Sequence, residues 1–206
     1  IDAVLITHAH LDHCGLLPRL VSQGFREKIY TTEASAELIS IVLHDSAKIQ
    51  MEDVKYKKKR HLKEGRKGPF EPEALYTEED VIQTLPLIQD VAYGEPIRPI
   101  PELQAVFREA GHILGSALLD LTTGEGDAKR RIVFSGDLGQ IDRPIVRDPA
   151  IITQADYLVM ESTYGDREHG ANGRTDTSKQ MAKLINETYE AGGNIVIPTF
   201  AIERAQ

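Results

Sequence analysis

The stretch Thr7–Cys14, with the sequence THAHLDHC, decides how this chain is interpreted. It follows the apolar run Ala3–Ile6, a pattern typical of a buried strand. Within six residues it places four side chains of the kinds that bind metal ions: His8, His10, Asp12 and His13. The first two histidines alternate along extended backbone and can point to the same side. The aspartate and the third histidine lie where we expect the chain to turn into a helix, so one short segment can supply ligands to two metal ions.

Two later segments add candidate ligands. His112 lies in the glycine-flanked segment Gly111–Ser116, and glycines let backbone pass close to a metal or a substrate. Asp137 follows the predicted strand residues 131–134 through Ser135 and Gly136. Taken alone, His112 is an ordinary loop histidine and Asp137 an ordinary turn former. Together with the first stretch, both are predicted to bind metal.

The composition is that of an ordinary globular protein. The chain has 206 residues, of which 41% are hydrophobic and 27% charged. No apolar run has the length of a membrane span and no signal peptide is evident, so we expect no membrane association. The single cysteine, Cys14, cannot form an internal disulfide, which favours a reducing compartment and a cytoplasmic location. The net charge of −8 does not by itself indicate a nucleic-acid partner.

The charge is unevenly distributed. The stretch Lys55–Lys67 holds eight basic residues and one acid, so the rest of the chain carries a net charge of −15. Two interpretations stay open: a solvated helix end with its loop, or an arm that contacts phosphates. Tyr56 is the only aromatic residue inside the stretch, which gives little support for base stacking.

The two ends suggest a piece of a longer protein. Ile1 opens directly into a predicted strand without an initiator methionine, and Gln206 stops where a new helix is expected to begin. We therefore expect parts of the site to come from residues outside this chain.

Helical and strand patterns alternate along the chain, which favours a layered α/β fold. Thr32 is a predicted N-cap. We expect helices over residues 12–22, 33–59, 78–89 and 177–191, and strands over 3–7, 28–31, 103–109, 117–122, 131–135, 157–161 and 194–198.

These motifs resemble those of a known family. In order and spacing, Thr7–Gly15, Gly111–Ser116 and Ser135–Gly139 are similar to the metal motifs of the metallo-β-lactamase superfamily. Glu161–Arg167 and Ile197–Gln206 resemble its β-CASP branch, which acts on nucleic acids. Together with residues 45–50, they are most similar to the RNA-cleaving group, which includes bacterial and archaeal ribonucleases and the eukaryotic pre-mRNA 3′-end-processing endonuclease.

The resemblance implies a fold and a domain organisation. The fold is α/β, a partial metallo-β-lactamase αβ/βα sandwich that leads into an inserted β-CASP domain. Residues 1–165 are expected to form the metallo-β-lactamase domain, without its first strands and its C-terminal part. Residues 166–206 are expected to begin the β-CASP domain.

The resemblance also implies two Zn²⁺ ions and a role for each motif residue. One zinc takes His8, His10 and His112; the second takes Asp12 and His13; Asp137 bridges them. Glu161 resembles the acidic residue that supports a β-CASP histidine, the expected proton donor. That histidine and a further ligand of the second zinc are expected beyond Gln206, and an acidic residue that orients the site before Ile1. The expected catalytic residues are Asp12, Asp137 and Glu161.

These features predict a zinc-dependent ribonuclease that hydrolyses RNA phosphodiester bonds with a hydroxide activated by two metals. Two zinc ions, two aspartates and a hydroxide leave a net charge of about +1, which suits a phosphate whose negative charge grows in the transition state. Zinc lowers the pKa of bound water to roughly 7, so no side-chain base is required. The expected partner is RNA, with no membrane, and a homodimer is left open.

Three alternatives remain open. A DNA nuclease of the same branch is the nearest. A metallo-hydrolase of small molecules, such as a thioester or lactam hydrolase, is disfavoured by Glu161 and residues 197–206. A non-catalytic scaffold subunit is disfavoured by the intact set of ligands. The sequence leaves open which RNA is cut and whether cleavage is internal or from an end.

Overall fold

The computed structural model describes residues 1–65, 67–166, 173–199 and 202. The chain divides into two compact units, Ile1–Glu161 and Ser162–Gln206. The first unit contains two β-sheets with the helices that connect their strands, and the second contains helix α5 (Gly173–Glu190). No helix in the described part of the chain is both long and apolar enough to cross a lipid bilayer.

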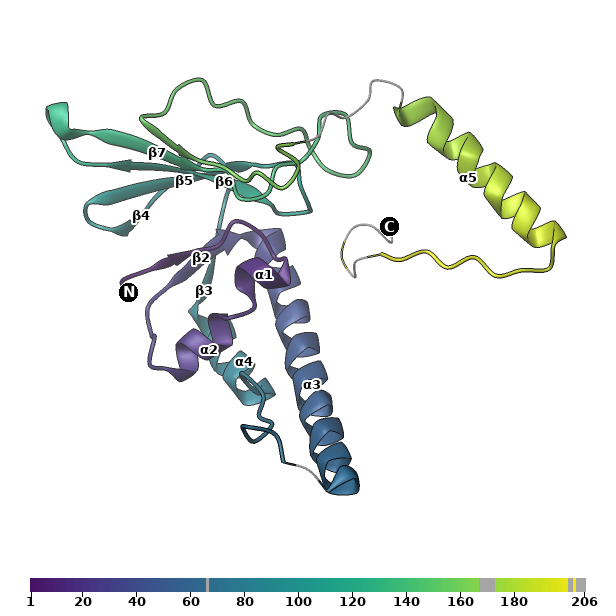
Figure 1. Cartoon of the computed structure of the whole chain (residues 1–206). Helices are drawn as coiled ribbons and strands as arrows, with labels where there is room; N and C mark the ends of the chain where they lie inside the picture. The colour runs from purple at the N-terminus through teal and green to yellow at the C-terminus, as the bar shows by residue number, and fades with distance from the viewer. Residues whose placement is uncertain (66, 167–172, 200–201, 203–206) are drawn as a thin grey trace. The chain divides into compact units, whose positions relative to one another are not determined.

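The first sheet is parallel and has three strands: β1 (Val4–Leu5), β2 (Ile29–Thr32) and β3 (Ile88–Val91). Val4 pairs with Ile29, and Tyr30 with Gln89. Parallel neighbours need a crossover connection, and helices supply both of them. Helices α1 (Leu11–Cys14) and α2 (Leu17–Ser22) lie between β1 and β2 in the chain (Figure 1). Helices α3 (Glu33–Glu64) and α4 (Glu78–Thr84) lie between β2 and β3.

The second sheet has five strands in sequence order. They are β4 (Pro96–Ile100), β5 (Leu103–Glu109), β6 (Ala117–Thr123), β7 (Arg130–Phe134) and β8 (Tyr157–Val159). The first four pair antiparallel, and β8 joins β7 in parallel. Residues of both sheets share one core, in which Val91 packs with Phe107, Ala117 and Leu119. The predicted α/β class is confirmed.

The helix expected over residues 12–22 is two helices, α1 (Leu11–Cys14) and α2 (Leu17–Ser22), so that prediction is wrong in detail. Pro18 lies at the start of α2. A proline has no N–H to donate to the preceding turn, and its ring clashes with the carbonyl of the residue four positions earlier. A continuous helix through Cys14 is therefore excluded.

Helix α3 (Glu33–Glu64) is longer than the predicted 33–59, and its predicted N-cap is confirmed. The side chain of Thr32 accepts a hydrogen bond from the backbone N–H of Ser35 at 3.4 Å. The helix ends at Gly65, whose φ of 61° is the left-handed conformation that glycine adopts at low cost.

The prediction of a helix over residues 78–89 is confirmed for its first half and wrong for its second half. Helix α4 (Glu78–Thr84) begins with a capping box between Thr77 and Asp80, but it ends at Thr84 and is followed by a 3₁₀ turn, η1 (Leu85–Leu87), that contains Pro86. Strand β3 follows directly and pairs with β2. Strand β4 was also missed, because its two prolines (Pro96 and Pro99) obscure a strand pattern.

The strand expected over residues 194–198 is not formed in the described residues, which have no regular structure from 194 to 199. A strand requires a partner that accepts its backbone hydrogen bonds. In the described part of the second unit the regular structure is helix α5 alone, so no strand offers such a partner.

A buried carboxylate links three neighbouring strands of the second sheet. Asp120 on β6 is only 5% exposed and accepts hydrogen bonds from Arg131 on β7 at 2.7 and 2.8 Å, and from Arg108 on β5 at 2.6 Å. The two hydrogen bonds from Arg131, and then the one from Arg108, hold the pKa of Asp120 below its usual value.

The depressed pKa of Asp120 predicts that the free energy of unfolding decreases in acid. Because its pKa is depressed in the folded state, its contribution is complete above about pH 4 and is lost as the pH falls through the folded pKa. We expect Asp120→Asn to reduce the free energy of unfolding by about 2 kcal/mol at pH 7, the scale of hydrogen bonds to charged groups. Urea unfolding at pH 7 and below pH 4 measures this. The deficit should shrink at low pH, whereas the exposed control Asp127→Asn should show none, and a deficit that is constant with pH would refute the assignment.

Candidate metal centre

Four of the predicted ligands meet at the ends of strands from both sheets. His8 and His10 follow β1, His112 lies in the loop between β5 and β6, and Asp137 follows β7. One ligand atom from each residue lies within 4.8 Å of all the others. The sequence placed these residues up to 129 positions apart, and the sandwich of the two sheets brings them together.

The spacing of the donor atoms fits a zinc ion. Nδ1 of His10 is 3.1 Å from Nε2 of His8 and 3.1 Å from Nε2 of His112. The Oδ2 atom of Asp137 lies 3.7 Å from the His8 nitrogen and 3.5 Å from the His112 nitrogen. Ligands about 2.05 Å from a tetrahedral zinc are about 3.3 Å from one another. Three imidazole nitrogens and one carboxylate oxygen therefore form a cradle of the right size and chemistry.

The protonation state of the histidines also suits a metal. Burial lowers the pKa of His8 to about 2, with further lowering from His13, His10 and His112. Burial lowers the pKa of His112 as well, although Asp137 opposes that effect. Nδ1 of His8 is 3.1 Å from the hydroxyl of Thr7, so a proton on Nδ1 can be donated there while Nε2 keeps its lone pair for a metal.

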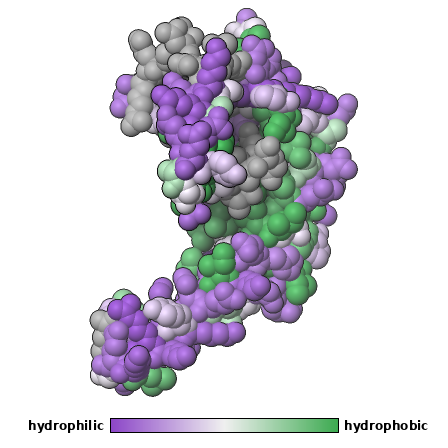
Figure 2. Space-filling model, turned by 90° about the vertical axis from the view of Figure 1, so that its right-hand side faces the viewer, coloured by the Kyte–Doolittle hydropathy of each residue, from purple (hydrophilic) through white to green (hydrophobic). Residues whose placement is uncertain are grey.

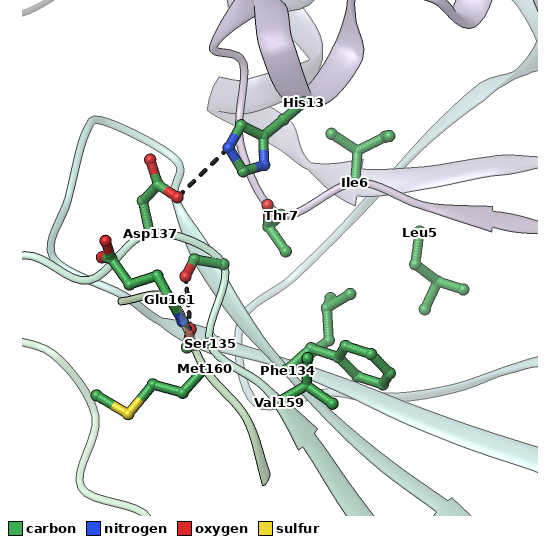
Figure 3. A pocket seen from close by; sticks show the side chains of 12 residues that line it. Leu5, Ile6, Thr7, His13, Phe134, Ser135, Asp137, Val159, Met160 and Glu161 are labelled. Carbon is green, nitrogen blue, oxygen red and sulfur yellow. Dashed lines mark hydrogen bonds and ion pairs between the residues drawn. The ribbon is translucent and has the colours of Figure 1, made fainter. Parts of the chain in front are cut away.

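A second group of donors adjoins the first and shares Asp137. Nε2 of His13 lies 3.3 Å from Oδ1 of Asp137 and 3.5 Å from Oδ2 of Asp12. Figure 3 shows the first of these contacts. Asp137 thus turns one carboxylate oxygen toward the three histidines and the other toward His13. The side chain of Asp12 is 80% exposed, so this second group is the more open of the two.

The His112 loop is held against the start of α3. The hydroxyl groups of Thr32 and Ser35 donate to the carbonyl of Gly115 at 2.5 and 2.8 Å. A Cβ at Gly115, whose φ is 82°, would lie 2.5 Å from the backbone nitrogen of Ser35. Sequence reasoning identified Thr32 only as a cap and missed Ser35. The hydroxyl pattern at a helix start was the one available signal.

The Asp137 turn is fastened to the same loop. The backbone N–H of Gly139 donates to the carbonyl of Ala110 at 2.9 Å. A Cβ at Gly139 would overlap the carbonyl of Gly111, so the two segments approach as closely as backbone allows. This contact fixes the position of Asp137 relative to His112.

Glu161 contacts the Asp137 turn directly. Its Oε1 atom accepts a hydrogen bond from the backbone N–H of Leu138 at 2.6 Å. Its own backbone N–H donates to the hydroxyl of Ser135 at 3.0 Å, a contact that Figure 3 shows. Residues on both sides of Asp137 are therefore bonded to Glu161. Its predicted support for a histidine beyond Gln206 stays a prediction.

Two substitutions of Glu161 test whether its hydrogen bond with Leu138 positions the metal ligands. Glutamine keeps a carbonyl oxygen that can accept from Leu138, whereas alanine leaves that N–H without its partner. We expect Glu161→Ala to weaken metal binding by about 10-fold, the scale seen when groups behind a ligand are removed. Glu161→Gln should stay within about twofold. Titration with Co²⁺ followed by absorbance measures both, and equal loss in the two variants would contradict the positioning role.

Comparison with known proteins supports this site. The sequence model of the metallo-beta-lactamase superfamily matches residues 1–188. Ribonuclease TTHA0252 of Thermus thermophilus is 38% identical over 206 residues, which are 100% of this chain and 41% of that protein. Transcription termination factor FttA of Methanocaldococcus jannaschii is 30% identical, and its counterpart in Methanothermobacter thermautotrophicus is 34% identical. Each of these two matches covers 100% of this chain and 30% of the factor.

The chain therefore spans less than half of the length of these curated relatives. The family match covers both groups of ligands, which the structure brings together from the ends of two sheets. The chain belongs to the metallo-β-lactamase superfamily.

Proposed function

We propose that the protein is a zinc-dependent ribonuclease that hydrolyses phosphodiester bonds of RNA. The observation that carries this proposal is the Asp137 carboxylate, whose two oxygens face two adjacent groups of ligands. Paired metal sites with a shared carboxylate suit phosphodiester hydrolysis, because they can flank the attacking and the leaving oxygen. The 38% identity to a protein named as a ribonuclease supports RNA as the substrate.

The proposed ligands form two groups, one for each zinc ion. His8, His10 and His112, with Oδ2 of Asp137, would hold the first zinc. Asp12 and His13, with Oδ1 of Asp137, would begin the second. Zinc ions bound there would polarise a phosphate oxygen and lower the pKa of a coordinated water.

The protein's own groups keep the site in position and set its charge. Thr7 orients the buried His8 ring, and Glu161 holds the backbone beside Asp137. The exposed carboxylate of Asp12 lies at the open side of the site, where a substrate can approach.

We assign residues 1–165 to a metallo-β-lactamase domain and residues 166–206 to the beginning of a β-CASP domain. We also propose that the protein is located in the cytoplasm.

The ends of the cleavage products test the mechanism. Because the nucleophile proposed here is water and not the RNA 2′-hydroxyl, we expect a 5′-phosphate and a 3′-hydroxyl, with no 2′,3′-cyclic phosphate. Mass spectrometry of fragments from a defined RNA decides this.

A matched substrate with a single 2′-deoxy residue at the cut position serves as the control, since it should still be cleaved there. A cyclic phosphate end, or complete protection by the 2′-deoxy residue, would refute the mechanism. Parallel assays on single-stranded DNA and on a β-lactam separate the proposal from the DNA nuclease and the small-molecule hydrolase.

A further inference from the structure

The last turns of α3 project from the body of the first unit. The buried residues of the helix are Ser35, Ile39, Leu43, Ser46 and Ala47, and none of the residues from 48 to 64 is buried. The hydrogen bonds that join the helix to the following segment lie near Tyr76, whose hydroxyl donates to Ser46, and Leu75, whose N–H donates to Gln50. Further along, Gly68 approaches the ring of His61, on the side of the helix away from Lys55 and Lys59. In Figure 1 the end of α3 extends beyond α2 and α4. We call residues 55–64 the basic arm.

The basic arm carries a one-sided concentration of positive charge. It contains six basic side chains and one acid, Glu64, which pairs with Arg60 at 2.8 Å. At helical spacing, Lys55, Lys58, Lys59 and Lys63 lie on one face. Within the arm that face contains no acid, the nearest being Glu52 one turn before Lys55, and no ion pair joins these four lysines to an acidic group among the described residues. Figure 2 shows mostly hydrophilic side chains over the lower tip, where α3 ends in Figure 1.

The arrangement is unfavourable for the isolated helix. Lysines spaced four residues apart repel each other, as Lys55 does Lys59 and Lys59 does Lys63. The helix macrodipole favours cations only within the last turn, which accounts for Lys63 and not for Lys55, Lys58 or Lys59. The preceding part of the same helix, residues 33–53, has five acids and one base, so the positive charge is confined to the part that makes no core contacts.

The chemistry of the arm favours a phosphate backbone over a protein surface. Lysine is depleted in protein–protein interfaces, whose centres are built from aromatic and apolar side chains. Ammonium groups bind phosphates as point charges without a fixed geometry. Lysines four residues apart repeat about every 6 Å along the helix axis, which suits successive phosphates of an extended strand.

The length of α3 sets the distance between the basic arm and the metal centre. Ser35 contacts the His112 loop through Gly115. At about 1.5 Å per residue, Lys55 lies about 30 Å and Lys63 about 42 Å along the axis from Ser35. With the phosphates of an extended strand about 6 Å apart, this distance corresponds to about 5–7 nucleotides. We propose that the basic arm binds the phosphates of RNA at this distance from the cut, so that it secures long substrates and leaves short ones unaffected.

This inference rests on the proposed ribonuclease function and is tested by charge removal. The arm variant replaces Lys55, Lys58, Lys59 and Lys63 with glutamine, a residue that favours helix as lysine does. The matched control replaces four other exposed basic residues of the first unit with glutamine: Lys28, Arg98, Lys129 and Arg130. Circular dichroism and thermal unfolding check that both variants fold.

On a 24-nucleotide RNA cut near one end, the arm variant should raise KM at least about tenfold and leave kcat unchanged. The slope of log KM against log salt concentration should fall by about 3, since each phosphate contact on a single strand contributes about 0.7. On a pentanucleotide, both constants should match those of the unsubstituted protein. A quadruple arginine variant, which keeps the charge, should restore the low KM.

Binding without cleavage separates this inference from the proposed function. In the Asp137→Ala background, fluorescence anisotropy should show at least about tenfold weaker binding of the 24-nucleotide RNA when the arm lysines are removed. That result supports the arm even if the protein cleaves no RNA, in which case the proposed function fails by itself. Undiminished binding, or a loss equal to that of the control, overturns the inference and leaves an acidic protein surface as the partner.

Discussion

Replacing Asp137 with alanine should lower the rate of RNA cleavage by at least about 10²-fold, the scale of losing a catalytic electrostatic element. The reason lies in the carboxylate, whose Oδ2 atom lies 3.5 to 3.7 Å from two histidine nitrogens while Oδ1 lies 3.3 Å from His13. One substitution therefore removes a donor from both groups of ligands. The metal content should fall by more than a single lost ligand would cause.

The fold should survive this change, because Asp137 lies in a loop after β7 and is partly exposed. Initial rates on a defined RNA, with zinc measured in the same samples, test the expectation. Asp127→Ala, which removes an exposed carboxylate from the β6–β7 connection, is the matched control and should have no effect. A near-normal rate with unchanged zinc content would contradict the role given to Asp137.

Removing the metal should abolish cleavage and lower the melting temperature. Without a cation, His8, His10 and His112 remain crowded, with ring nitrogens 3.1 Å apart, and the Asp137 carboxylate loses the charge that offsets its own. A ligand that binds only the folded state stabilises it by mass action. We expect about two zinc ions per chain in the intact protein and a restored melting temperature when zinc is added back to the chelated protein.

Elemental analysis and differential scanning calorimetry before and after chelation measure these two quantities, and neither depends on activity. Mg²⁺ is the control for a general effect of divalent cations, because it prefers six oxygen ligands and suits a histidine-rich cradle poorly. Full nuclease activity of the metal-free protein would contradict the proposal that zinc is required for RNA cleavage.

Local sequence patterns predicted much of the fold. The strand predicted over residues 103–109 has the same bounds as β5, and Thr32 was recognised as the cap of α3 because its hydroxyl can satisfy a free N–H. Predictions failed where a tertiary partner decides the structure. Residues 88–91 are a strand because β2 lies beside them, and residues 194–198 form none in the described unit, where no strand lies beside them.

In the candidate site, too, the features set by local sequence were predicted and those set by tertiary contacts were not. His8, His10, His112 and Asp137 were predicted because each sits in a recognisable motif at a strand end. Asp12 and His13 were predicted as ligands of the second metal; the structure places His13 against Asp137 and Asp12 against His13, and their metal binding stays a prediction. The support of the His112 loop by Ser35 was not predicted, since no motif links a helix start to the carbonyl of Gly115.

The sequence by itself determined which donors are available, because the type of a ligand and its place at the end of a strand are local properties. It also concentrated basic residues at the end of α3. Only the tertiary structure decided that Asp137 presents one oxygen to each group, that Glu161 bonds the backbone of Leu138 beside it, and that Gly139 lies against Gly111. These contacts depend on how two sheets pack, and the free energy of that packing belongs to residues distant in the chain, which no local pattern records.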